Sequence, residues 1–120
     1  MEGQGPRSVL CVGGRIPRVN SAECFDAGLL IEWVNSVDDA KPLLRHSYDV
    51  LLLDSFGDRV AATDLAKKFK AKAPNTKVVW VCGRPDIVDV AGEVISAATG
   101  GEMITSLRRI LRDDYLTSKR

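Results

Sequence analysis

The chain has 120 residues, and its 17 basic and 16 acidic side chains leave a formal net charge of +1. This length corresponds to about one domain, and a charge so close to zero gives no electrostatic footprint for nucleic acid or for an anionic membrane. No apolar run approaches the roughly 20 residues of a membrane span, and the N-terminus lacks a signal-peptide core, so we expect a cytoplasmic protein.

Local patterns divide the chain into short strands and helices. Residues 1–7 are polar and glycine-rich, and we expect them to be disordered before a single domain at residues 8–120. Apolar runs bounded by turn residues predict strands at residues 8–12, 29–34, 50–53, 77–82 and 94–96. Helical spacing predicts helices at residues 21–27, 40–46, 61–73 and 86–91, and a last helix after Gly100 and Gly101. Ser36 or Asp38 can cap the second helix, and Pro42 falls in its first turn.

Strands alternate with helices along the whole domain. This order predicts an α/β fold, in which right-handed crossovers join parallel strands and helices cover both faces of the sheet. Val50 to Leu53 are four consecutive apolar residues, the pattern of a strand buried on both faces. Asp54 follows them directly, and ligands of open α/β sheets bind beyond the carboxyl ends of the strands. Asp54 is therefore the leading candidate for chemistry.

Two of the predicted helices carry basic residues outside their apolar stripes. In the helix at residues 61–73 these are Lys67, Lys68, Lys70 and Lys72, and we expect them to form a solvated face. The last helix carries Arg108, Arg109 and Arg112. We expect these arginines to make up a basic last turn, which suits the helix dipole.

The cysteine, histidine and tryptophan residues offer little for catalysis. The three cysteines are odd in number and widely separated, which argues against a disulfide framework: Cys11, Cys24 and Cys82. With a single histidine and no Cys-x-x-Cys pair, there is no zinc ligand set. We expect His46 to lie in a surface loop, and Trp33 and Trp80 to be packing residues.

The segment at residues 48–54, YDVLLLD, resembles the receiver domain of two-component response regulators. Residues 34–40 and 73–79 are similar to family sequences at the corresponding points, and the order of elements agrees over about residues 8–112. The resemblance implies a flavodoxin-like, doubly wound fold with a five-stranded parallel sheet of order 2-1-3-4-5.

In that family, the aspartate that ends the third strand accepts a phosphoryl group from a histidine kinase, and Asp54 stands at its position. Acids at the end of the first strand hold the divalent cation that this transfer needs. Gly13 and Gly14 occupy those positions here, and the cation Arg15 follows. Neither glycine can ligate a metal through a side chain.

Two further family positions also differ in this chain. The hydroxyl residue that binds the phosphoryl oxygen corresponds to Cys82, a poor hydrogen-bond donor. The lysine that ends the fifth strand corresponds to Ser96, within one residue of register, and Ala97 replaces the proline that follows it.

The missing partners decide the expected chemistry. Each uncompensated pair of unit charges a few Å apart costs about 4 kcal/mol at an effective dielectric constant near 20. Arg15 could offset part of this cost, but a guanidinium cannot bridge the attacking and leaving oxygens as a metal does. We therefore expect Mg²⁺ binding and Mg²⁺-dependent phosphorylation to be lost or severely weakened, and we expect no metal or other cofactor.

The leading interpretation is an atypical receiver-like signalling module that is not an enzyme and acts by protein–protein interaction. The resemblance implies a sensor kinase or an output protein as its partner, and the last helix with the fourth and fifth strands as its output surface. A homodimer through the last helix is a further expectation, whereas nucleic acid and membrane are not expected partners of this domain.

Several alternatives remain open. Asp54 could still accept phosphate, with Arg15 as a surrogate for the cation. The Gly13–Gly14 turn could instead cradle the phosphate of a nucleotide or another small molecule, although its spacing is not Gly-x-Gly-x-x-Gly. The domain could also have a purely structural or oligomerising role. Asp54 itself could form a structural ion pair with Arg15 or Arg84, while Asp58 caps the following helix.

Overall fold

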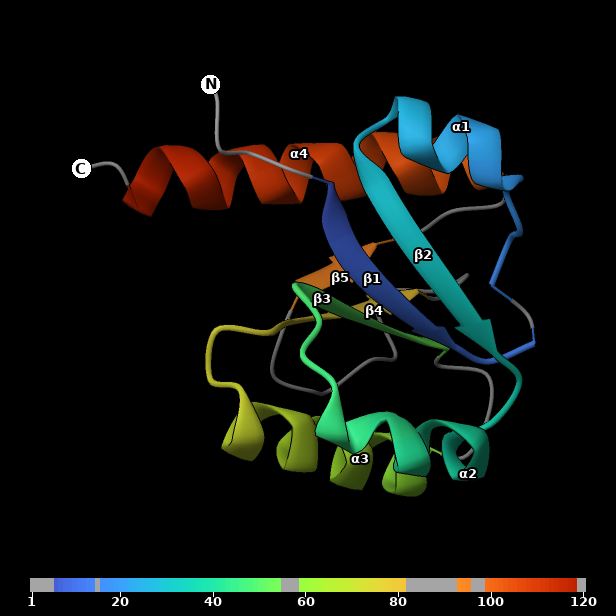
Figure 1. The fold of residues 1–120 in the computed structure, drawn as a ribbon, viewed down its shortest axis with the longest axis vertical. Helices are drawn as coiled ribbons and strands as arrows, with labels where there is room; N and C mark the ends of the chain where they lie inside the picture. The colour runs from blue at the N-terminus through green and yellow to red at the C-terminus, as the bar shows by residue number, and fades with distance from the viewer. Residues whose placement is uncertain (1–5, 15, 55–58, 82–92, 96–98, 119–120) are drawn as a thin grey trace.

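The computed structural model describes residues 6–14, 16–54, 59–81, 93–95 and 99–118. Four strands form a parallel sheet in the order β2-β1-β3-β4, and a three-residue strand, β5, pairs in parallel with β4 (Figure 1). The strands are β1 (Arg7–Val12), β2 (Leu29–Val34), β3 (Val50–Asp54), β4 (Lys77–Val81) and β5 (Glu93–Ile95). The expected α/β class and parallel sheet are confirmed.

Helices cover both faces of this sheet. They are α1 (Ser21–Asp26), α2 (Val37–Ala40), the 3-10 helix η1 (Lys41–Arg45), α3 (Arg59–Lys72) and α4 (Gly100–Ser118). In Figure 1, α1 and α4 lie above the sheet, and α2, η1 and α3 lie below it. This layered arrangement is compatible with a doubly wound fold.

The central strand β3 contributes to a core on each side of the sheet. All five of its residues are buried. Val50 and Leu52 belong to the core beneath α1 and α4, which also contains Met103 and Leu107. Leu51 and Leu53 belong to the opposite core, with α3 residues such as Leu65 and Phe69. Successive side chains of a strand point to opposite faces, which is why an uninterrupted apolar run is needed here.

The second predicted helix is divided into two types of helix. Ser36 caps α2 as expected, since its Oγ accepts a hydrogen bond from the Asp39 N–H at 3.2 Å. The helix expected at residues 40–46 is present mainly as the 3-10 helix η1, because α2 ends at Ala40. Pro42 explains the change: it has no N–H to donate to a carbonyl four residues earlier. His46, which follows η1, is exposed as expected.

The last helix is longer than the sequence pattern indicated. Thr99 and Glu102 begin α4 with reciprocal hydrogen bonds of 3.2 Å between the side chain of each and the N–H of the other. The helix then runs to Ser118, since residues 113–118 contain no glycine or proline to stop it. The expected basic last turn is wrong, because Arg108 and Arg109 lie in the middle of α4.

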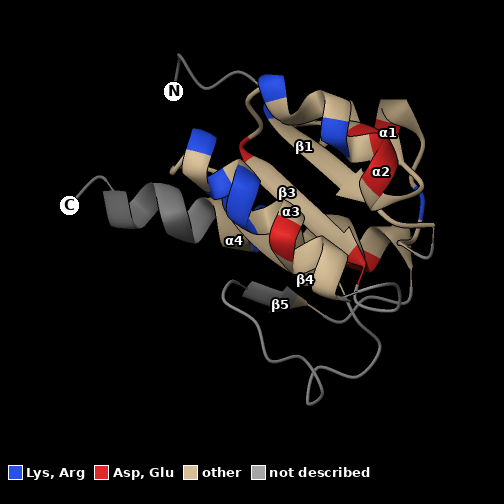
Figure 2. Ribbon diagram, turned by 90° about the horizontal axis from the view of Figure 1, so that it is seen from below, with Lys and Arg blue, Asp and Glu red and all other residues tan. Residues whose placement is uncertain are grey.

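The outer face of α3 agrees with its sequence pattern. Its lysines are exposed. Figure 2 is seen from the side of α3 and shows Lys and Arg residues (blue) on this helix. Lys68 Nζ lies 3.1 Å from Asp64 Oδ2, and Lys70 Nζ donates to the carbonyl oxygens of Pro74 and Thr76. The lysines thus form a solvated face that is partly tied to neighbouring groups.

The structure refines some expected boundaries. β1 begins at Arg7, one residue earlier than predicted, and the Arg7 N–H donates to the carbonyl oxygen of Gly28 at 2.9 Å. The helix expected at residues 86–91 lies outside the described residues. None of the helices in the described part of the chain is both long enough and apolar enough to cross a membrane.

Candidate functional site

Asp54 lies where the sequence places it, at the carboxyl end of the central strand. It is the last residue of β3 and the register partner of Val81, the last residue of β4. It is only 9% exposed, and it is the buried residue with an ionisable carboxylate in the described part of the chain. A carboxylate this deeply placed at the ligand-binding edge of a parallel sheet remains the leading candidate site residue.

Gly13 closes one side of this carboxylate. It follows β1 directly, and its N–H donates to the carbonyl oxygen of Val34 at 3.0 Å. Its φ is +132°, a conformation that favours glycine. A β-carbon on residue 13 would lie 2.9 Å from Asp54 Oδ2 and would collide with the β-carbon of Asp54. The side chain of Asp54 therefore occupies the space that a side chain at position 13 would need.

The two glycines of the Gly13–Gly14 pair differ in their surroundings. A β-carbon on Gly14 would meet no atom within 4 Å, and this residue is exposed. An acidic side chain would thus have room at position 14 but not at position 13. The contact between Gly13 and Asp54 is a feature that residue types and spacing alone do not show.

The described residues assemble no cation site around Asp54. Nowhere in the part of the chain that the structure describes do three or more histidine, cysteine, aspartate or glutamate side chains gather closely enough to hold a metal ion. Oxygen ligands from several residues are what Mg²⁺ prefers, and the first strand supplies no such side chain at Gly13 or Gly14.

Only three of the site residues predicted from the sequence lie within the described part of the chain. Asp54, Gly13 and Gly14 come together at the carboxyl edge of the sheet. The other candidates lie outside the described residues: Arg15, Asp58, Cys82, Arg84, Ser96 and Ala97. Val81 and Ile95 are register partners, so β4 and β5 end at the same edge as β3.

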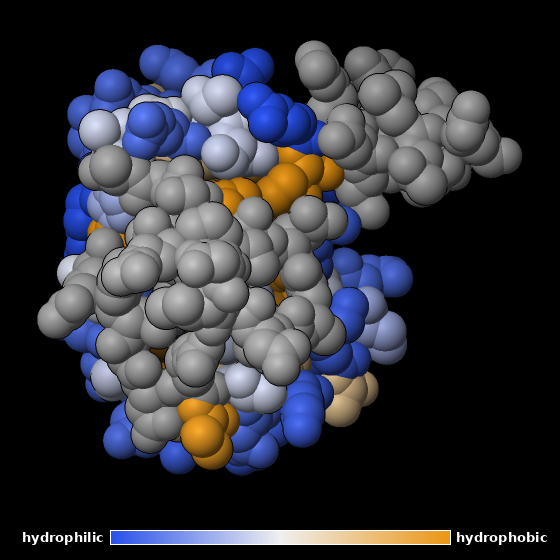
Figure 3. Space-filling model, turned by 180° about the vertical axis from the view of Figure 1, so that it is seen from behind, coloured by the Kyte–Doolittle hydropathy of each residue, from blue (hydrophilic) through white to orange (hydrophobic). Residues whose placement is uncertain are grey.

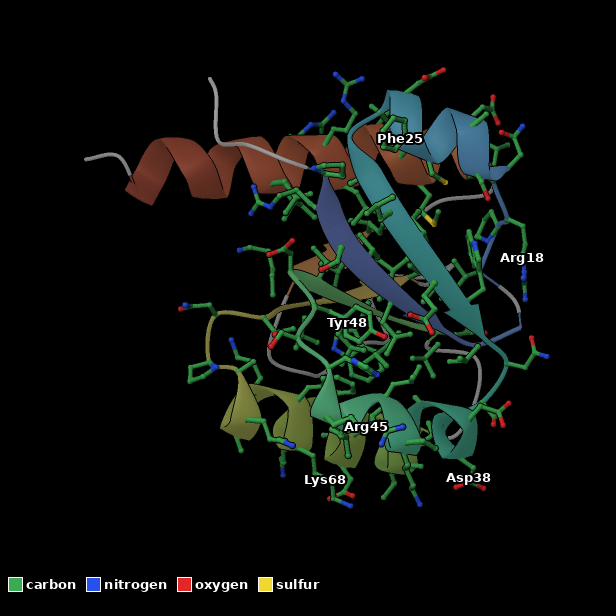
Figure 4. All side chains as sticks on the ribbon, viewed as in Figure 1. Arg18, Phe25, Asp38, Arg45, Tyr48 and Lys68 are labelled. Atoms are coloured by element: carbon green, nitrogen blue, oxygen red, sulfur yellow. The ribbon has the colours of Figure 1, made fainter. Side chains whose placement is uncertain are left out.

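Arg18 is a charged residue of this edge that sequence reasoning did not single out. Its guanidinium carbon lies 4.9 Å from the ring centroid of Trp33, and its Nη2 donates to Asn35 Oδ1 at 3.1 Å. Figure 4 shows Arg18 beside the carboxyl end of β2. The only sequence signal was a cation in the loop after the first strand. Contact with the ring gives half-buried Trp33 a role beyond packing.

The other buried polar groups do not form a catalytic set. Burial raises the pKa of both the Cys11 and the Cys24 thiols, which keeps them protonated and poor nucleophiles. Tyr48 lies just before β3, at the opposite edge from Asp54, and its Oη donates to Glu32 Oε1 at 2.9 Å. Burial, reinforced by this hydrogen bond, raises the Tyr48 pKa to about 12. Trp80 is buried as expected, and within the described chain its Nε1–H has no hydrogen-bond partner.

Two surface hollows lie away from Asp54. One, of about 290 Å³, follows the edge strand β2 and includes Ser21, Trp33 and Tyr48 in its wall. The other, of about 440 Å³, lies at the amino edge of the sheet between Arg7, the turn at Gly28 and α4. Neither is lined by Asp54 or Gly13.

The sequence was compared with models of protein families and with curated proteins. No family model and no curated protein matches it.

Proposed function

We propose that the chain is an atypical receiver-like signalling module of the two-component type, with a flavodoxin-like fold, that acts by binding another protein. Two findings support the fold assignment. The strand order β2-β1-β3-β4, with β5 next to β4, is the order expected for that fold. The buried carboxylate of Asp54 also ends the central strand, where the family carries its phosphoacceptor.

The contact between Gly13 and Asp54 carries the functional part of the proposal. Phosphoryl transfer to a carboxylate brings two anions together, and a metal ion normally neutralises the developing charge. At position 13, a metal-binding carboxylate would collide with Asp54, so this position cannot provide a cation ligand without movement of the strand ends. Since each uncompensated charge pair costs about 4 kcal/mol at an effective dielectric constant near 20, Mg²⁺-dependent phosphorylation is lost or severely weakened.

Recognition then takes the place of phosphoryl transfer. The proposed output surface is α4 together with β4 and β5, and its partner is a sensor kinase or an output protein. Ile104 and Ile110 of α4 are only partly buried against the core. Figure 3 shows apolar surface (orange) on the side of the molecule behind the view of Figure 1. Partly buried apolar side chains on α4 support a protein-binding role for this helix.

Incubation with acetyl phosphate and Mg²⁺ tests this proposal, with intact-protein mass spectrometry as the readout. We expect no mass gain on the wild-type chain, under conditions that phosphorylate a conventional receiver domain run in parallel. A stoichiometric gain of one phosphoryl group that disappears in Asp54→Asn would overturn the proposal and favour the phosphoacceptor alternative.

A Mg²⁺ titration followed by amide chemical shifts separates loss of the metal from loss of the acceptor. We expect no saturable shifts at Gly13, Gly14 or Asp54 in the concentration range that saturates the conventional receiver domain. Saturable shifts at these residues, abolished in Asp54→Asn, would show that the cation site is intact and would contradict the proposed mechanism.

A further inference from the structure

Arginine side chains converge on the hollow at the amino edge of the sheet, the edge opposite Asp54. This hollow of about 440 Å³ lies between the start of β1, the turn before β2, and α4. In Figure 1, α4 passes close to the point where β1 begins. Its lining includes Arg7 from β1, and Thr105, Arg108 and Arg109 from α4.

The spacing along α4 explains why these residues meet. Positions three and four apart share one face of a helix, so Thr105 stands on the same side as both Arg108 and Arg109. Arg7 extends from the neighbouring strand into the same space. Three arginines and one threonine, whose side chains all carry hydrogen-bond donors, therefore line a single concave surface.

The charge in this hollow is not balanced by carboxylates of its own wall. No aspartate or glutamate belongs to the described lining. The structure gives Arg108 and Arg109 no ion pair among the described residues, and both are exposed. Arg7 Nε lies 3.7 Å from Asp49 Oδ2, but that carboxylate also accepts a hydrogen bond from the Ser8 N–H at 2.8 Å. Three positive charges in one hollow are a local concentration in a chain whose net charge is only +1.

The helix itself does not account for these arginines. A cation stabilises the helix dipole only within the last turn, and α4 continues to Ser118 beyond Arg108 and Arg109. The apolar stripe of α4 does not need them either, since Met103, Leu107 and Leu111 already fill the core side. Placing like charges together is unfavourable, so a bound anion would relieve the repulsion between Arg108 and Arg109.

We propose that this hollow binds a small phosphate monoester. A phosphate dianion matches the charge and the forked donors of several guanidinium groups better than a single carboxylate does. Leu29 and Leu111 also line the hollow and provide apolar contact for the group that carries the phosphate. This site is separate from Asp54, so its occupancy does not depend on the function proposed above.

Isothermal titration calorimetry with phenyl phosphate tests the proposal at a constant ionic strength of about 0.15 M, which screens non-specific attraction. We expect saturable binding to the wild-type chain. The double variant Arg108→Gln/Arg109→Gln should bind at least about tenfold more weakly, because two charge-assisted donors are lost. Arg109→Lys keeps the positive charge but removes the forked pair of guanidinium donors. Its affinity for phenyl phosphate should lie between those of the wild type and the double variant.

Arg45→Gln is the matched control. Arg45 is an exposed arginine at the end of η1, and Figure 4 shows it on the side of α2 and α3, away from α4. This variant should bind phenyl phosphate as the wild type does. Circular dichroism and thermal melting establish that each variant is folded, as expected for changes at exposed positions.

Four outcomes would overturn the proposal. One is the absence of saturable phenyl phosphate binding, and another is an equal loss of affinity in Arg45→Gln and in the double variant. Benzoate binding as tightly as phenyl phosphate would exclude recognition of a phosphate dianion. Inorganic phosphate binding as tightly as phenyl phosphate would exclude the apolar contact with the ester group.

Discussion

The backbone of Gly13 lies against the side chain of Asp54, so closely that a β-carbon at residue 13 would stand 2.9 Å from Asp54 Oδ2. The loop after β1 and the end of β3 are thus fitted to each other around a glycine. Asp54 is held in a space too narrow for a second side chain from position 13, and the proposed loss of metal-dependent phosphorylation follows from that fit.

Gly13→Ala should destabilise the domain by about 2 to 5 kcal/mol, because it adds both an unfavourable φ and a steric collision. Urea denaturation measures the change in the free energy of unfolding. Gly14→Ala is the control, since its β-carbon would enter open space and should cost about 0.5 kcal/mol or less.

A double-mutant cycle tests whether steric collision with Asp54 causes the destabilisation by Gly13→Ala. Asp54→Gly removes the β-carbon involved in the collision, so Gly13→Ala should cost less in that background than in the wild type. If Gly13→Ala lowers the free energy of unfolding equally in the wild type and in Asp54→Gly, contact with Asp54 is not what excludes a side chain at position 13.

Leu51→Ala and Leu52→Ala should each cost about 2 to 5 kcal/mol, although the two side chains enter different cores. Both leucines are fully buried, so each truncation removes apolar contacts that cannot be replaced by water. Leu30→Ala on the edge strand, where the leucine is 52% exposed, should cost far less. Chemical denaturation measures all three, and a small cost for either β3 leucine would contradict burial on both faces.

Tyr48 should make the stability fall at high pH. Its pKa is raised from the model-peptide value of 10.0 to about 12 in the folded state, so the folded protein holds this proton more tightly than the unfolded chain does. The stabilisation is fully present below pH 10 and is lost as the pH rises toward 12, by up to about 2 kcal/mol.

Tyr48→Phe isolates this effect from the lysines and cysteines that titrate in the same range. The variant should lose less stability than the wild type between pH 9 and pH 12, as measured by urea denaturation at each pH. At neutral pH it should cost about 1 kcal/mol, for the lost hydrogen bond to Glu32. Parallel pH profiles for the two proteins would exclude a raised Tyr48 pKa.

Cys11 and Cys24 should resist alkylation in the folded protein. Both side chains are buried, and burial raises the pKa of each thiol, so little reactive thiolate is present. We expect iodoacetamide at pH 8 to modify them at least about a hundredfold more slowly than in the urea-unfolded chain, since reaction requires local opening. Peptide mass spectrometry resolves the rate at each cysteine. Equal rates in the folded and unfolded chains would show that these thiols are accessible.

The periodicity of the sequence predicted the strands well, because each lies in an apolar run bounded by turn residues. The predicted bounds of β2 are the observed ones, and those of β1 and β3 differ by one residue at one end. Helix ends were harder to predict. Pro42 converted part of the second helix to a 3-10 helix, and α4 continued to Ser118, past the arginines that were expected to form its last turn.

The candidate site was predicted only in part. The position of Asp54 follows from the length of the apolar run before it, which is a local property. The close approach of Gly13 to Asp54 and the contact of Arg18 with the Trp33 ring join residues from different strands and loops. Such contacts depend on how β1, β2 and β3 are placed in the sheet, and spacing along the chain does not contain that information.

By itself, the sequence determined the α/β class, the burial of β3 and the location of Asp54 at a strand end, because periodicity and apolar runs dictate which segments must be covered. Only the tertiary structure decided that residue 13 has no room for a side chain, and that Arg7 joins Arg108 and Arg109 around one hollow. Both are packing relationships between segments far apart in the chain, and they arise only when parallel strands and their helices come together.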